Sequence, residues 1–316
     1  MQSKKNFMDY MASIITDLHD AERMGTEHVY QSTRNRINDF INGSTLSFND
    51  ITTLWLQAFQ NYLLKRQLSW NTISTYMRIL RAVYYRAVDD GLAPFRPRLF
   101  KGVYTGIRGT TKRAIGEQTL RQLKLPTGKS ERLENARQLF MLLFMLRGIP
   151  FVDIAYMRRR DLNGNMLTYR RRKTGAWLSV HIEPQAMQLI EHLKNNNPTS
   201  PYLFPIISTT GAEGYKQYCN ALRCFNYRLK QLADNLQSKD VKLSSYTARH
   251  SWATLANYHN FQPELICNAM GHSSVKVTET YFKRHTDEQI HEMNHRILTQ
   301  LLDDSAFPQP PHNQAG

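Results

Sequence analysis

One change of hydrophobic period limits what this chain can fold into. Apolar residues recur at helical spacing through most of the sequence, and the two-residue alternation typical of strands begins only after residue 160. There Asn163-Gly164 signals a turn, residues 166–169 and 177–180 are typical of strands, and Lys173-Thr174-Gly175 predicts the hairpin turn between them. The sequence therefore predicts a mainly α protein with one small antiparallel β-sheet.

The first hundred residues predict a helical domain. Its clearest helix begins after Asn71 or Thr72 and ends at Gly91, with one apolar face. Two further helices near 26–42 and 50–67, with a short one before them, would complete a four-helix bundle. Arg78 and Arg81 lie off the apolar face of the clearest helix, so both are candidate contacts for a backbone phosphate.

A stretch rich in Pro, Gly and basic residues, 93–120, indicates an interdomain linker. We expect a helical domain at 1–106, a basic linker at 107–112 in which Lys112 is a further candidate phosphate contact, and a second domain at 113–303. The second domain should contain helices near 136–146, 184–194, 216–237 and 286–302. The polar, Pro-rich tail at 304–316 is expected to be disordered.

The charge points to a polyanionic partner. Lys and Arg number 41 against 26 Asp and Glu, a formal net charge of +15. Both predicted domains share the excess, which favours a clamp that closes on a polyanion from two sides over a basic tail. The sequence contains no run of eighteen apolar residues and no signal peptide pattern, and its three cysteines lack metal-type spacing. We therefore expect a cytoplasmic protein with reduced thiols and no membrane partner.

Residues 244–284 carry the groups that would act on such a partner. Arg249 is followed by Gly271-His272, and Tyr281 comes nine residues after His272. Cleavage of a phosphodiester needs a nucleophile, cations for the non-bridging oxygens and an acid for the leaving oxygen. Tyr281 can attack, Arg249 and His272 can hold the phosphate, and Lys173 at the hairpin turn can protonate the leaving oxygen.

Together with the early Arg147 and the box Tyr246-Thr247-Ala248-Arg249, these residues resemble a tyrosine recombinase of the phage-integrase family, in its integrase or DNA-invertase branch. The resemblance implies a SAM-like core-binding domain, a mostly helical catalytic domain and no cofactor or metal. It also implies recombination of specific DNA sites through a 3′-phosphotyrosyl intermediate and a Holliday junction. The partners would be duplex DNA, three further copies of the chain in a homotetramer, and accessory DNA-bending proteins, in a bacterial nucleoid.

Two positions depart from that family's pattern. Tyr246 stands where the family has His, and we expect it to position the phosphate instead of acting as a base, because a phenol is a weak base at neutral pH. Pro150 stands where the early arginine is expected, and Arg147 is predicted to reach the same space from another turn. His250, next to Arg249, is expected to point elsewhere on its helix.

Basic runs at 158–160 and 170–173 add two further candidate DNA contacts, Arg158 and Arg171.

Three alternatives stay open at this point. A turn at 260–262 between two helices is compatible with a non-catalytic helix-turn-helix regulator. A type IB topoisomerase uses similar chemistry. The run His291-Glu292-Met293-Asn294-His295 matches the helical zinc motif of metalloproteases, although no later Glu follows it.

Overall fold

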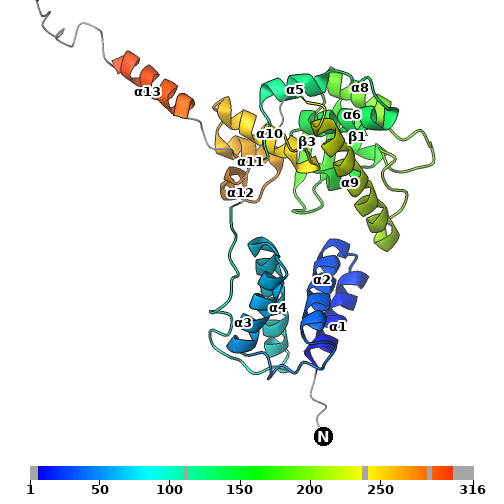
Figure 1. Cartoon of the computed structure of the whole chain (residues 1–316). Helices are drawn as coiled ribbons and strands as arrows, with labels where there is room; N and C mark the ends of the chain where they lie inside the picture. Colours follow the sequence, from blue (N-terminus) through cyan, green and yellow to red (C-terminus); the bar gives the residue numbers. More distant parts are fainter. Residues whose placement is uncertain (1–5, 110–112, 237–240, 283–286, 302–316) are drawn as a thin grey trace, which may run out of the picture.

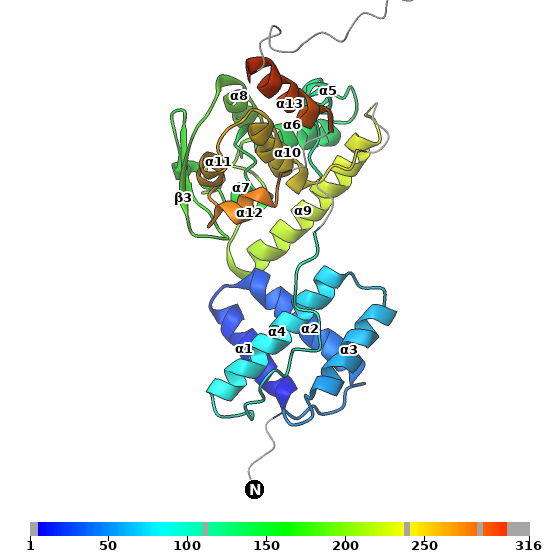
Figure 2. The ribbon, with the colours of Figure 1, turned by 90° about the vertical axis from the view of Figure 1, so that its left-hand side faces the viewer.

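The computed structural model describes residues 6–109, 113–236, 241–282 and 287–301. Two helical parts are joined by the stretch after α4, and α13 extends away from the rest of the chain (Figure 1). α9 points toward the N-terminal part, where α2 contacts it (Figure 2). Among the described residues no helix is both long and apolar enough to cross a bilayer.

The N-terminal part is the predicted four-helix bundle, with α1 Phe7–Asp20, α2 Met24–Phe40, α3 Thr53–Lys65 and α4 Trp70–Asp89. The side chains of Asn6, Thr52 and Ser69 accept hydrogen bonds from the first turns of α1, α3 and α4 and so define where these helices begin. Tyr84 of α4 lies at the centre of the core, fully buried, and its hydroxyl donates to the Pro94 carbonyl at 2.9 Å.

The Pro- and Gly-rich stretch after α4 is not all linker. Leu99, Phe100 and Val103 are buried in the N-terminal core. The guanidinium of Arg108 lies 4.4 Å from the centre of the Trp70 ring, which also ties this residue to the N-terminal part. Ile115 is the first residue of the second core, so the chain passes from one core to the other between 108 and 115.

The C-terminal part is mostly helical around one small sheet. The order of its elements is α5 Glu117–Lys124, α6 Glu131–Met145, α7 Phe151–Ala155, a 3₁₀ turn at Arg159–Asp161, β1 Leu162–Asn163, β2 Met166–Arg170, β3 Trp177–His181, α8 Pro184–Leu193, α9 Gly211–Ala233, α10 Ser245–Tyr258, α11 Pro263–Met270, α12 Val275–Glu279 and α13 Asp287–Leu301. The strands pair antiparallel in the order β1-β2-β3. The apolar helix α6 packs against α8, α9 and α10, and the predicted hairpin is confirmed.

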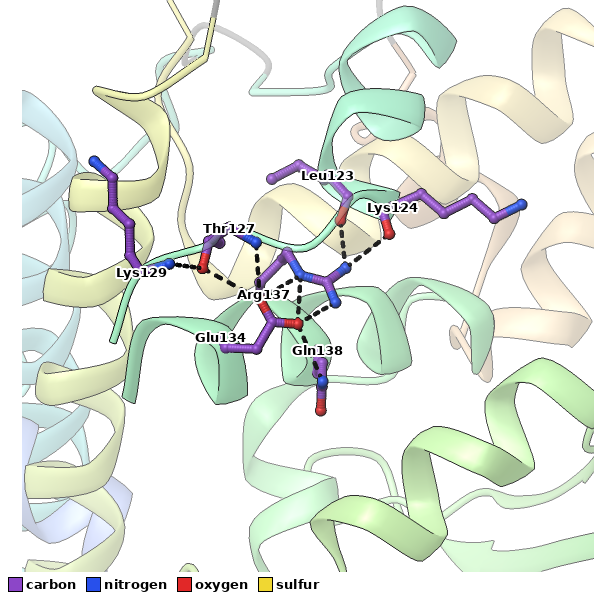
Figure 3. A network of polar contacts seen from close by, with 7 residues as sticks. All are labelled: Leu123, Lys124, Thr127, Lys129, Glu134, Arg137 and Gln138. Atoms are coloured by element: carbon purple, nitrogen blue, oxygen red, sulfur yellow. Dashed lines mark hydrogen bonds and ion pairs between the residues drawn. The ribbon is translucent and has the colours of Figure 1, made fainter. Parts of the chain in front are cut away.

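A buried arginine fixes α5 to α6. Arg137 of α6 donates to the carbonyls of Leu123 and Lys124 at 2.7 and 3.1 Å, which the end of α5 leaves unpaired (Figure 3). Its guanidinium also pairs with the Glu134 carboxylate, which in turn accepts from the Thr127 main chain. The hydrogen bonds from Arg137 lower the pKa of Glu134 to about 2.

Candidate active site

Arg249 is the centre of the candidate site. It lies on α10 with 3% of its surface exposed. Its guanidinium donates to the carbonyls of Gly148 at 2.7 Å and Met270 at 2.8 Å. Gly148 has φ +67°, and a Cβ atom there would lie 2.7 Å from the Arg249 Cα atom, so only glycine permits this approach. Arg249 is thus fixed before any substrate binds.

The left-handed end of α11 places His272 beside Arg249. Gly271 caps α11 with φ +62°, and the main-chain N–H of His272 donates to Cys267 at 3.1 Å. Arg249 Nη2 lies 2.7 Å from His272 Nε2, and an arginine can only donate. Nε2 therefore carries a lone pair, and Nδ1–H donates to Thr278 Oγ1 at 2.8 Å. Burial and the nearby cations lower the pKa of His272 to about 3, so the ring is neutral.

Tyr281 follows α12 and packs into the same site. Its main-chain carbonyl accepts a hydrogen bond from Thr254 of α10 at 3.1 Å. Its ring stacks on His272, with centroids 4.9 Å apart, and the Arg249 guanidinium carbon lies 5.5 Å from the ring centroid. The structure therefore brings the three residues predicted from 244–284 together.

His250 also borders Tyr281, and the prediction that it points elsewhere is wrong. The two ring centroids are 4.8 Å apart. The reason is that Tyr281 lies along the side of α10, where His250 and Thr254, one turn apart, share a face.

Tyr246 lies one turn before His250 and is 48% exposed. Partial burial and the nearby Tyr281 raise its pKa, so its hydroxyl is protonated and can donate.

The hairpin reaches the site from the sheet. Lys173 is exposed in the β2–β3 turn, and its charge is one of the causes of the lowered pKa of His272. Thr174 donates to the Gly271 carbonyl at 3.4 Å, which places the turn beside the end of α11. Lys173 therefore lies where a cation can approach a phosphate held by Arg249.

Arg147 is bonded through its side chain to the sheet. It adopts φ +59°, and its guanidinium donates to the Ser179 carbonyl of β3 at 3.3 Å. Pro150, in the position of the family's early arginine, is buried and begins α7. The structure thus shows no contact of Arg147 with Arg249, His272 or Tyr281 among the hydrogen bonds of the described residues.

The other predicted DNA contacts differ in location. Arg78 and Arg81 are exposed on α4, and Arg158 is partly exposed before the 3₁₀ turn. Arg171 is 5% exposed and paired with Asp153, so it differs from these three in lying buried beside the candidate site. The basic run 170–173 is typical of a solvated strand, and nothing in its sequence indicates that Arg171 faces inward. Lys112 lies outside the described residues.

The alternative motifs also have places in the structure. The zinc-type motif lies on α13, where His291 and His295 are exposed, and the described residues contain no group of three or more potential metal ligands. α10 and α11 do form a helix-turn-helix pair, but Arg249 of α10 bonds to the end of α11 inside it. These two helices build the candidate site.

Comparisons with known proteins agree with this geometry. Residues 6–101 match the model of the phage integrase SAM-like domain, and residues 123–288 match that of the phage integrase family. No curated protein matches the sequence at a significant level.

Solved structures share the fold. The integrase of transposon Tn1549, in complex with transposon right end DNA, aligns with a TM-score of 0.62 at 15% identity, covering 93% of this chain and 100% of that one. A lambda integrase dimer bound to a COC′ core site aligns with a TM-score of 0.63 at 16% identity, covering 90% and 79%. A lambda integrase tetramer bound to a Holliday junction aligns with a TM-score of 0.61 at 12% identity, covering 90% and 80%.

Proposed function

Because the chain belongs to the phage integrase family, we propose that it is a site-specific tyrosine recombinase that cuts and rejoins duplex DNA. One observation carries the proposal: Tyr281 packs against a fixed arginine and a neutral histidine in a single site. A nucleophile beside preorganised donors is what transfer of a phosphoryl group requires.

Cleavage begins when Arg249 exchanges its bond to His272 for a non-bridging oxygen of the scissile phosphate. Tyr281 Oη attacks phosphorus, the P–O5′ bond breaks, and a 3′-phosphotyrosine forms. The neutral His272 has a lone pair on Nε2 that can take the tyrosine proton, while Lys173 supplies a proton to the leaving 5′ oxygen. The reverse steps join the tyrosine-bound strand to a partner 5′-hydroxyl, and the phosphotyrosine bond conserves the energy for rejoining.

The DNA would lie between the two basic parts of the chain. The exposed Arg78 and Arg81 of α4 offer cations for one side of the duplex, and Lys173 offers one from the other. The Tn1549 and lambda integrases with this fold are seen bound to DNA, and lambda integrase as a tetramer on a Holliday junction. We extend both features to this chain.

Assembly into a tetramer has support in the C-terminal region. An apolar cavity of about 750 Å³ lies between α6, α10 and α11, lined among others by Phe144, Leu255 and Phe261. α13 extends from the chain (Figure 1), with Ile290, Met293 and Leu298 exposed. An exposed apolar helix and an apolar cavity are complementary, so α13 of one subunit is suited to the cavity of another.

The test is covalent capture. Purified protein is incubated with fragmented genomic DNA from its source, and DNA linked to protein is precipitated from dodecyl sulfate with potassium and sequenced. The wild type should yield one recurrent sequence, and a nicked duplex of that sequence should give a protein–DNA adduct on a denaturing gel.

Tyr281→Phe should bind this duplex normally and form no adduct, whereas Tyr227→Phe, at an exposed tyrosine of α9, serves as the matched control and should react normally. An adduct with Tyr281→Phe would refute the assignment of the nucleophile. Plasmid relaxation without joining between two sites would instead identify a topoisomerase.

A further inference from the structure

Arg171, directly after β2, occupies a buried position beside the candidate site. Its Nη1 donates to the carbonyls of Met270 at 2.8 Å and Gly271 at 2.9 Å, and its Nε lies 3.3 Å from the Asp153 carboxylate. A Cβ atom on Gly271 would lie 2.7 Å from Arg171 Cδ, so the turn that precedes His272 packs directly against this side chain. None of the hydrogen bonds in the described part of the chain uses its Nη2.

Two guanidinium groups share one carbonyl oxygen. Arg249 Nη2 and Arg171 Nη1 each lie 2.8 Å from the Met270 oxygen, so these nitrogens are separated by no more than twice that distance. Asp153 is the carboxylate that faces the pair, and His272 is neutral. Burial and, next, the charge of Arg171 lower the pKa of Arg249. Two buried cations with one carboxylate leave a positive charge for which an anion is the natural partner.

The position at which the family pattern has its early arginine carries an uncharged residue in this chain. Pro150 occupies it, and the guanidinium of Arg147 bonds to β3. The acidic residue of the same pattern, Asp153, is present and holds Arg171. A guanidinium from the hairpin is thus paired with the acidic residue of a pattern whose own arginine is missing.

We propose that Arg171, and not Arg147, is the second arginine of the active site and binds a non-bridging oxygen of the scissile phosphate together with Arg249. This inference rests on the proposed recombinase function. Arg171 would be a second fixed cation that neutralises negative charge on the non-bridging oxygens as Tyr281 attacks phosphorus. The competing role is structural: Arg171 would only support the Gly271 turn.

The test compares two substrates. One nicked duplex of the captured site carries an ordinary scissile phosphate, and the other carries a methylphosphonate, whose missing charged oxygen reduces the need for a cation. Adduct formation is measured in single turnover for the wild type, Arg171→Ala and the matched control Arg147→Ala. Failure of the wild type to form any adduct would overturn the proposed function itself and so is distinguishable from failure of this inference.

Arg171→Ala should slow cleavage of the phosphodiester by about 100- to 1,000-fold, the usual loss for one fixed donor. On the methylphosphonate its rate should approach that of the wild type, and Arg147→Ala should resemble the wild type on both substrates. Equal losses of Arg171→Ala on both substrates would show a structural role only, and a phosphate-dependent loss in Arg147→Ala would move the assignment to Arg147. Either result overturns the inference.

Circular dichroism decides whether Arg171→Ala is folded. If it is not, Arg171→Lys, which keeps the charge beside Asp153, replaces it in the comparison. A lysine lacks the fork that bonds two carbonyls and a phosphate together. Its loss on the phosphodiester should therefore exceed its loss on the methylphosphonate, and equal losses would again overturn the inference.

Discussion

Replacing Thr278 by Val should slow DNA cleavage without weakening DNA binding. Thr278 is fully buried, and its hydroxyl accepts the hydrogen bond from His272 Nδ1–H at 2.8 Å. Valine keeps the shape but leaves that donor without a partner, which costs about 1–3 kcal/mol. The ring cannot compensate by exchanging tautomers, because Nε2 must keep its lone pair toward Arg249. The population with His272 correctly oriented should fall by about 5- to 150-fold.

The assay is single-turnover adduct formation on the nicked duplex, with DNA affinity measured by gel shift at the same salt concentration. Thr278→Ser is the matched control, because it keeps the hydroxyl and loses only a methyl group. The valine variant should bind like the wild type and cleave at the reduced rate, and the serine variant should cleave nearly as fast as the wild type. A valine variant with normal cleavage, or a serine variant as slow as valine, would refute the role assigned to this hydrogen bond.

Four further predictions follow from the structure. The pKa of His272 in the folded chain is about 3, below its ordinary value of 6.5, so the unfolded chain binds a proton first as the pH falls. The free energy of unfolding should therefore fall as pH drops from 6.5 toward 3, by roughly 2 kcal/mol between pH 7 and 5. Urea titrations should show this slope in the wild type and not in His272→Gln. Glu134→Gln should lower the free energy of unfolding of the C-terminal part by about 2–3 kcal/mol above pH 4.5. This difference from the wild type should vanish as pH falls from 4.5 toward 2, where the wild-type carboxylate becomes protonated. A difference that stays unchanged in acid would contradict the ion pair. Gly148→Ala combines a strained φ of +67° with a contact of 2.7 Å to the Arg249 backbone, so it should lose at least about 2 kcal/mol of stability in thermal melts, and cleavage with it. Deletion of residues 287–316 should preserve adduct formation on one site but abolish exchange between two sites in a plasmid recombination assay, and normal exchange would exclude α13 from assembly.

The sequence predicted the architecture well where the signal is local. Amphipathic spacing located α2, α3 and α4, and the two-residue alternation located β2 and β3 to within a residue. Short elements were missed: α7 and α12 have five residues each, too few to show a period. The apolar residues at 99–103 looked like linker because Pro and Gly surround them, and only tertiary packing shows them buried.

The site was predictable in part for the same reason. Tyr281, Arg249 and His272 come from one continuous stretch and were identified from their spacing, and the structure brings them together. The contact of His250 with Tyr281 and the burial of Arg171 were not predicted, because the surroundings of both residues are set by distant segments, Tyr281 for the first and Asp153 with Gly271 for the second. Within a run of four basic residues, nothing local distinguishes the one that faces inward.

The hydrogen bond from Thr254 to the main chain of Tyr281 has a genetic consequence. It ties the tyrosine to the same helix that carries Arg249, so we expect each subunit to attack with its own tyrosine. In an assembly that mixes Tyr281→Phe subunits with Arg249→Ala subunits, no active site contains both groups. Two such defective alleles should therefore fail to complement one another, whereas an enzyme that borrowed its tyrosine from a neighbour would recover a fraction of its activity.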